Sequence, residues 1–213
     1  MHGVPDADGP QVPGRSRQII EAAYDLLAEE GLEGLTIRAV LEKTGLSRRA
    51  FYERFAGKDE LMVAVFERTV RQAASHYSEQ AAALSDPLEC LELIVTCIVL
   101  GKSSPDALDY GHSNRRGAAM SREHLRLADS RPQELQAALS PLITLIARQL
   151  SRGMEAGSVR RCAAERLATL VYNLVATTVH TELLAHETAP PDRARRVQLA
   201  KDIWEFCRGA IAA

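Results

Sequence analysis

Apolar residues recur at intervals of three and four along most of the chain, which is the spacing of one face of an α-helix. This pattern predicts a first helix over residues 16–30, and Gly31 follows where a helix-ending residue belongs. No stretch alternates apolar and polar residues as a half-buried strand does, and no Asn-Gly hairpin pair occurs. Ala and Leu supply most of the apolar side chains, whereas aromatic residues make up only 5% of the chain. The sequence therefore predicts an all-α protein.

Two short helices separated by a glycine turn are predicted after the first helix. Thr36 is placed to cap the first of them. Gly45 suits the left-handed backbone of a tight turn, and Ser47 is placed to cap the second, which runs to about Phe55. Two short helices joined in this way form a helix-turn-helix pattern. An amphipathic helix over residues 58–78 is expected to connect this module to the remainder of the chain.

The remainder of the chain is predicted to form longer helices. They are expected over residues 88–101, 117–130, 142–156, 162–186 and 192–212. Residues 102–113 are expected to be irregular, and Pro141 is expected to kink or restart a helix. The first fourteen residues, rich in Pro, Gly and Asp, are expected to form a mobile tail. The expected parts are a tail over 1–14, a helix-turn-helix domain over 15–60 and a helical domain over 61–213.

Positive charge is concentrated on the predicted helix-turn-helix. The formal net charge of the whole chain is −2, so no global field indicates a polyanionic partner. Residues 43–58, however, hold five cations against Glu53 as the one acidic residue, a balance of +4. Arg48, Arg49 and Tyr52 lie where the second short helix begins and can project outward, whereas Phe51 points to the core. A short helix that exposes arginines fits the major groove of duplex DNA.

Enzymatic and metal-binding alternatives find little support. The run from Gly101 to Ser103 lacks the earlier glycine of a phosphate-binding loop, because Thr96 stands there. His180 and His186 are six residues apart and point to nearly opposite sides of a helix, which argues against a zinc site. The four cysteines lack CxxC pairing, and no signal peptide or membrane span is recognisable. We therefore expect a cytoplasmic protein with reduced thiols that is not an enzyme and needs no metal and no cofactor.

The stretch TIRAVLEKTGLSRRAFYERFAGKDEL, residues 36–61, resembles the DNA-binding module of the tetracycline-repressor (TetR) family of bacterial transcriptional regulators. The matching positions are Gly45, Leu46, Ser47, Tyr52, Phe55, Lys58 and Leu61. Leu41 and Thr44 depart from the family pattern, which usually has alanine there, without removing the motif. The resemblance implies phosphate contacts by Thr36, Ser47, Tyr52 and Lys58, and we expect base contacts from Arg48 and Arg49. The full set expected at DNA is Arg15, Arg17, Thr36, Lys43, Ser47, Arg48, Arg49, Tyr52, Arg54 and Lys58.

The last two predicted helices carry more apolar surface than one protomer core needs. Residues 162–186 are apolar nearly all round, and residues 192–212 show two apolar faces. The resemblance implies that these helices pair with those of a second copy across a twofold axis. The expected dimer interface comprises Leu170, Leu174, Val175, Leu183, Val197, Ala200, Trp204, Cys207 and Ile211.

The resemblance also implies an effector pocket in the middle region. Candidate lining residues, chosen by position and type, are Phe66, Tyr77, Leu93, Cys97, Tyr110, His112, Leu125, Met154, Tyr172 and His180. The polar group that includes Arg115 and Arg116 fits either an exposed loop or a contact with an anionic group of the ligand. The expected function is a homodimeric repressor that binds a palindromic operator in double-stranded DNA and is released by a small, partly apolar effector. An activator, and a helical ligand-binding or protein-interaction module with an unused helix-turn-helix, are the alternatives.

Overall fold

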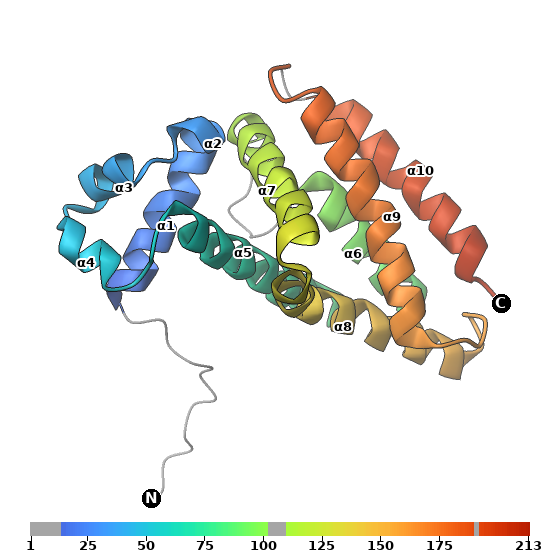
Figure 1. Ribbon diagram of the computed structural model, residues 1–213. Helices are drawn as coiled ribbons and strands as arrows, with labels where there is room; N and C mark the ends of the chain where they lie inside the picture. The colour runs from blue at the N-terminus through green and yellow to red at the C-terminus, as the bar shows by residue number, and fades with distance from the viewer. Residues whose placement is uncertain (1–13, 102–109, 190–191) are drawn as a thin grey trace, which may run out of the picture.

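The structure is a computed structural model that describes residues 14–101, 110–189 and 192–213, with the side chains of 110–114 excepted. Within these residues the regular secondary structure is helical, apart from one isolated bridge between Val159 and Ala212, which confirms the all-α prediction (Figure 1). The helices are α1 (Gly14–Glu29), α2 (Gly31–Gly34), α3 (Ile37–Thr44), α4 (Arg48–Tyr52), α5 (Lys58–Ala81), α6 (Pro87–Leu100), α7 (Tyr110–Ser130), α8 (Pro132–Ala156), α9 (Ala164–Ala185) and α10 (Arg193–Ile211). None of the helices in the described part of the chain is long and apolar enough to cross a membrane.

The four N-terminal helices enclose a small core of their own. Leu27 of α1, Val40 of α3 and Phe51 of α4 are fully buried in it. The first turn of α5 closes this core with Leu61, and α7 contributes Ala119. The core of the helix-turn-helix therefore depends on two helices that continue into the rest of the molecule.

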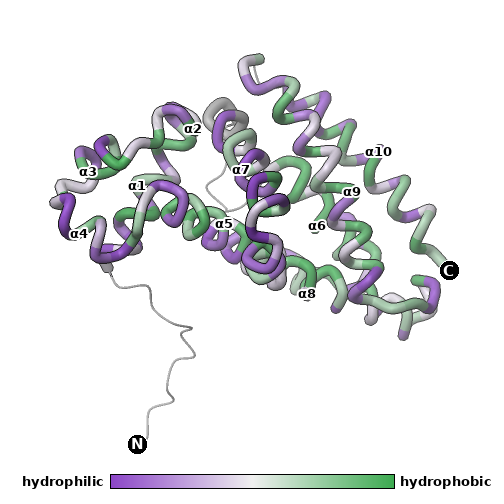
Figure 2. Tube along the Cα trace, in the orientation of Figure 1, coloured by the Kyte–Doolittle hydropathy of each residue, from purple (hydrophilic) through white to green (hydrophobic). Residues whose placement is uncertain are grey.

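A larger core fills the space between α5, α6, α7, α8, α9 and α10. Helix α10 packs mainly on α6, and α9 packs mainly on α8 and α7. In Figure 2 hydrophobic and hydrophilic residues alternate in short patches along α10, as they do on a helix with one buried side. Met120 of α7 packs against both cores, so this helix spans the two halves of the protein.

Two expectations for the longer helices are corrected. Helix α7 begins at Tyr110, seven residues before the predicted start, so residues 110–113 are helical rather than irregular. Contacts with α1 hold this polar start in place, because Arg115 donates a hydrogen bond to the carbonyl oxygen of Glu29. Helix α8 runs through Pro141 without a break, since a continuous buried stripe that includes Leu135 and Leu142 outweighs the missing backbone hydrogen bond.

Smaller differences concern the N-terminal part. The short helix α2 was not predicted, although Gly31 does adopt the left-handed backbone, with φ +75°. Helix α4 ends at Tyr52 rather than near residue 55. Helix α1 already begins at Gly14, and the remainder of the predicted tail, residues 1–13, lies outside the described residues.

Candidate nucleic-acid interface and internal cavity

The turn between α3 and α4 is fixed by local hydrogen bonds. The Thr36 hydroxyl oxygen accepts from the amide of Ala39 at 3.0 Å, and the Ser47 hydroxyl oxygen accepts from the amide of Ala50 at 3.2 Å. Gly45 lies at φ +68°, and its N–H donates to the Leu41 carbonyl. Because each capping oxygen uses only a lone pair, the exposed hydroxyl protons of Thr36 and Ser47 can still be donated to a phosphate.

Helix α4 has one buried and one exposed side. Phe51 is fully buried, and its ring centroid lies 5.7 Å from that of Phe55. On the other side Arg48 and Arg49 are exposed, and Tyr52 is 53% exposed. The aromatic side chains thus anchor a five-residue helix whose opposite surface offers two guanidinium groups and a phenol to a partner.

The cations of this region differ in how far acidic neighbours compensate them. Lys43 binds Glu29 at 2.8 Å and lies 3.7 Å from Asp25, and its hydrogen bond with Glu29 is the main cause of its raised pKa. Arg49 pairs with Glu53 at 3.0 Å and Arg17 with Glu21 at 2.9 Å, one helical turn apart in each case. Such exposed pairs contribute only about 0.3–0.5 kcal/mol, so a phosphate can replace the carboxylate.

Two arginines of the expected set are left for a partner. Arg48 and Arg54 are exposed and form no ion pair with any residue that the structure describes. Arg15 is also exposed, at the start of α1. Lys58, expected at a phosphate, instead donates to the carbonyl oxygen of Leu32 at 2.9 Å, so in this structure it links α5 to α2. The local excess of +4 expected from the sequence is therefore carried mainly by the arginines around α4.

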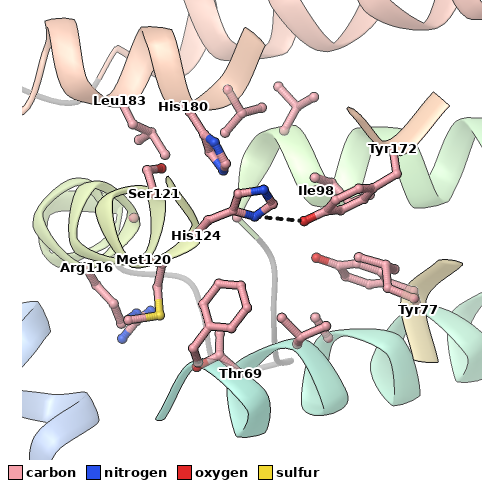
Figure 3. Close-up of a pocket in the computed structure, with 18 of the residues that line it drawn as sticks. Thr69, Tyr77, Ile98, Arg116, Met120, Ser121, His124, Tyr172, His180 and Leu183 are labelled. Atoms are coloured by element: carbon pink, nitrogen blue, oxygen red, sulfur yellow. Dashed lines mark hydrogen bonds between the residues drawn. The ribbon is translucent and has the colours of Figure 1, made fainter. Parts of the chain in front are cut away.

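A cavity of about 180 Å³ lies between α5, α6, α7, α8, α9 and α10 (Figure 3). Four of the residues expected to line an effector pocket meet there: Phe66, Tyr77, Tyr172 and His180. A second space of about 230 Å³ adjoins it and shares Val99, Val179, Leu183 and Arg196 as lining residues. Together the two spaces reach the size of ordinary ligand sites, which begins at about 300 Å³.

The other expected lining residues lie elsewhere. Leu93 packs against the outside of the large core, Cys97 is buried beside Gln80, Met154 lies near the end of α8, and Leu125 is 50% exposed. The side chains of Tyr110 and His112 lie outside the described residues. The structure therefore places four of the ten expected residues at this cavity and four away from it, and a role of any of them in ligand binding stays a prediction.

Sequence reasoning missed the contribution of α7 to the cavity wall. Gly117, Met120, Ser121 and His124 line the cavity from this helix. These positions follow the i, i+3, i+4, i+7 rule within the predicted helix over residues 117–130, so they share one face of it. The signal was therefore present in the sequence, but these residues were not among the candidates.

A cluster of aromatic and imidazole rings forms the centre of the cavity. The rings of His124 and His180 have their centroids 4.6 Å apart, and the Tyr172 hydroxyl lies 3.5 Å from Nδ1 of His124. Burial lowers the pKa of His124, and burial together with the neighbouring His124 lowers that of His180 to about 4. Burial also raises the pKa values of Tyr172 and Tyr77. The cluster is therefore uncharged at neutral pH.

Helix α7 also connects the cavity to α1. The Arg116 guanidinium carbon lies 4.2 Å from the centroid of the Tyr24 ring, a cation–π distance, and Arg116 also lines the cavity. The preceding residue, Arg115, donates to the Glu29 carbonyl at 2.7 Å. Arg68 of α5 adds an ion pair with Glu21 at 2.8 Å. A displacement of Arg116 in the cavity wall therefore alters a contact of α1, the helix that packs against α3.

The expected dimer face is corrected on α10. Five of the expected residues are buried in the protomer core and are unavailable to a partner: Val175, Ala200, Trp204, Cys207 and Ile211. Leu183 and Val197 are partly buried, and Leu183 lines the cavity. Two residues of the expected set, Leu170 at 60% and Leu174 at 37%, are exposed on α9, and Phe206, which was not in that set, is 67% exposed on the opposite stripe of α10. Figure 1 shows α9 and α10 at the end of the molecule away from α3 and α4.

Comparison with known proteins finds relatives of the N-terminal part of the chain. Residues 19–65 match the family described as bacterial regulatory proteins, tetR family. The chain is 40% identical over 68 residues to the HTH-type transcriptional repressor AcnR of Corynebacterium glutamicum, which covers 32% of this chain and 36% of that protein. It is 27% identical over 100 residues to the HTH-type transcriptional repressor KstR2 of Rhodococcus jostii, covering 47% and 46%. The chain thus matches between about a third and a half of the length of these relatives.

Solved structures extend the likeness of the fold to the whole chain. The transcriptional regulator FadR of Bacillus subtilis in complex with stearoyl-CoA has a TM-score of 0.70 at 18% identity and covers 92% of this chain and 98% of that one. The ketosteroid transcriptional regulator KstR2 of Mycobacterium tuberculosis has a TM-score of 0.58 at 20% identity and covers 95% and 97%. Both likenesses concern the arrangement of helices.

Proposed function

We propose that this chain, whose residues 19–65 match the tetR family of bacterial regulatory proteins, is a transcriptional repressor. It binds a palindromic operator as a homodimer. It leaves the operator when a small, partly apolar ligand fills the cavity. The observation that carries the DNA-binding part is the two-sided α4. Its buried Phe51 fixes the helix, and its exposed Arg48 and Arg49 lie on the side that can approach base edges.

Base recognition is assigned to the two arginines. An arginine can donate two hydrogen bonds to O6 and N7 of guanine, which contributes about 1–3 kcal/mol of discrimination. Arg48 forms no ion pair with a described residue, whereas Arg49 must give up its ion pair with Glu53 to bind a base. The Thr36 and Ser47 hydroxyls and Arg54 lie at positions suited to phosphates.

A dimer follows from the shortness of the reading helix. Five residues contact few base pairs, so specificity requires a second half-site about 34–36 Å away, read by a second copy. Leu170, Leu174 and Phe206 offer exposed apolar side chains on the last two helices. Their burial in a symmetric contact would remove apolar area that a monomer leaves in water.

Ligand control is supported by the cavity and by α7. The cavity wall is mostly aliphatic and aromatic, which suits an apolar ligand, and the related fold of FadR is known in complex with stearoyl-CoA. A ligand that displaces Arg116 weakens its contact with Tyr24 and thereby changes the position of α1. Release from DNA then results because the ligand binds better to a form of the dimer whose two α4 helices no longer match the groove spacing.

Selection from genomic fragments tests this proposal. The full-length protein should recover fragments that share one palindrome, and footprinting should protect both half-sites. An Arg48→Ala, Arg49→Ala double variant should lose specific binding, because the two side chains assigned to base edges are removed. Arg71→Ala, an exposed arginine in the middle of α5, serves as the matched control and should bind normally.

Two outcomes would contradict the proposal in different ways. Recovery of no common sequence would favour a helical module with an unused helix-turn-helix. Unchanged affinity of the double variant would remove α4 from the account of DNA binding. An operator that lies upstream of a promoter and raises its activity would indicate an activator.

A further inference from the structure

The histidine pair in the cavity wall is not explained by packing alone. His124 projects from α7 and His180 from α9, and Figure 3 shows the two imidazoles next to each other in the cavity wall, with their centroids 4.6 Å apart. Phe66 lies edge-on to His124 with the ring centroids 6.1 Å apart, and Tyr172 lies at the same centroid distance from His124. Two polar rings thus lie among aromatic side chains, where leucine would fill the space without any desolvation of nitrogen.

Most of the hydrogen-bonding capacity of these rings is unused. A neutral imidazole has one N–H donor and one acceptor nitrogen. Within the part of the chain that the structure describes, the Tyr172 hydroxyl is the one hydrogen-bond partner of His124, at the long distance of 3.5 Å, and His180 has none. The remaining nitrogens are not among the fully enclosed polar atoms without a partner, and both histidines line the cavity.

Charge considerations favour an uncharged ligand group at this place. Among the residues that the structure describes, the charged side chains that line the cavity are Arg116 and Arg196, and no aspartate or glutamate lies there to stabilise a protonated imidazole. Burial lowers the pKa of both histidines, and each therefore offers a neutral N–H and a lone pair at neutral pH. A carbonyl oxygen or a hydroxyl can pair with these neutral groups without the desolvation of a charge, whereas a hydrocarbon leaves them unpaired.

We propose that His124 and His180 form a subsite for an uncharged oxygen of the ligand, so that the effector is an apolar molecule carrying a carbonyl or hydroxyl group beside the imidazole pair. This inference rests on the proposed use of the cavity as the effector site. A ketone, an ester or a thioester has the required chemistry, with the apolar part of the molecule lying against Phe66, Tyr77 and Leu142. Between ligands of similar shape and size, the imidazoles then favour the one that carries the uncharged oxygen.

Three eight-carbon probes separate the possibilities: 2-octanone, octanoate and n-octane. Binding to the full-length protein is measured by thermal shift and by imidazole nitrogen and proton NMR signals, in the absence of DNA. We expect 2-octanone to bind roughly tenfold more tightly than n-octane, which corresponds to one good hydrogen bond, and to move the signals of His124 and His180. Octanoate should bind more weakly than 2-octanone at neutral pH.

Variants of one histidine supply the matched control. His180→Leu should bring the affinities for 2-octanone and n-octane together, whereas His180→Gln, which keeps a donor and an acceptor, should retain part of the preference. Equal affinities in the unmodified protein, tightest binding of octanoate, or no binding of any probe would overturn the proposal. Failure of 2-octanone to release DNA, when it binds at the pair, would instead contradict the proposed ligand control and leave the subsite intact.

Discussion

Mild acidification is expected to destabilise the folded protein through His180. Burial and the neighbouring His124 lower the pKa of His180 from 6.5 to about 4 in the folded state. Between these two values the unfolded chain takes up a proton at this residue and the folded chain does not. The folded state is therefore penalised as the pH falls below 6.5, and the penalty stops growing near pH 4.

The size of the effect follows from the two pKa values. One pKa unit corresponds to about 1.4 kcal/mol, so the full penalty is on the order of 3 kcal/mol once the pH reaches about 4. Between about pH 7 and about pH 5.5, before most carboxylates titrate, the same relation gives a loss of about 1 kcal/mol. The pKa of His124 is lowered by burial as well, so it adds to the loss in the same direction.

Urea unfolding at both pH values, at one fixed protein concentration, measures this loss. His180→Gln removes the titrating group and should show a pH-dependent loss of stability that is smaller by about 1 kcal/mol than that of the unmodified protein. Tyr172→Phe keeps both imidazoles in the same cluster and should retain the full loss. Equal losses in the unmodified protein and in His180→Gln would refute the assignment of a depressed pKa to this side chain.

Two further predictions concern the contacts outside the histidine pair. Arg116→Gln and Tyr24→Leu should each lower the free energy of unfolding measured with urea. The loss in the double variant should differ from the sum of the two single losses by about 0.5–1 kcal/mol, which is the coupling energy of the pair. Additive losses would mean that the 4.2 Å contact contributes nothing to stability. Phe206→Glu should shift the sedimentation of the protein from dimer to monomer. Leu125→Glu, at an exposed apolar position of α7, should leave the sedimentation unchanged. A dimer that persists in Phe206→Glu would show that the interface does not include this side of α10.

The helix-turn-helix could be predicted closely because its determinants are local. Thr36 and Ser47 cap helices within three residues of themselves, and Gly45 occupies the left-handed turn that an L side chain disfavours. The exposed and buried sides of α4 followed from the same short stretch, since Phe51 and Tyr52 are adjacent and must point to different sides. No distant part of the chain is needed to decide any of these features.

The less accurate predictions depend on contacts between distant segments. Helix α7 begins seven residues earlier than expected because its first turns pack on α1, through Arg115 and Arg116. Helix α10 has two apolar stripes of similar strength, and only its packing on α6 decides that the stripe with Trp204 is buried and the one with Phe206 is exposed. A sequence pattern gives the period of a helix but not which of two apolar sides faces the protomer core.

Helix α7 gives a physical reason for coupling between the two sites. Along less than three turns it presents Arg116 to Tyr24, Ala119 to the core of the helix-turn-helix, Met120 to both cores and His124 to the cavity. A helix resists bending over this length, so a ligand that moves the backbone at His124 also moves it at Arg116. Coupling then requires only that the small ligand bind better to one position of α7 and that DNA bind better to another. Each of the two partners shifts the equilibrium between these positions by the difference in its affinity for them. In the proposed repressor this coupling is reciprocal. If the ligand lowers the affinity for the operator by a certain factor, operator DNA lowers the affinity of the cavity for the ligand by the same factor.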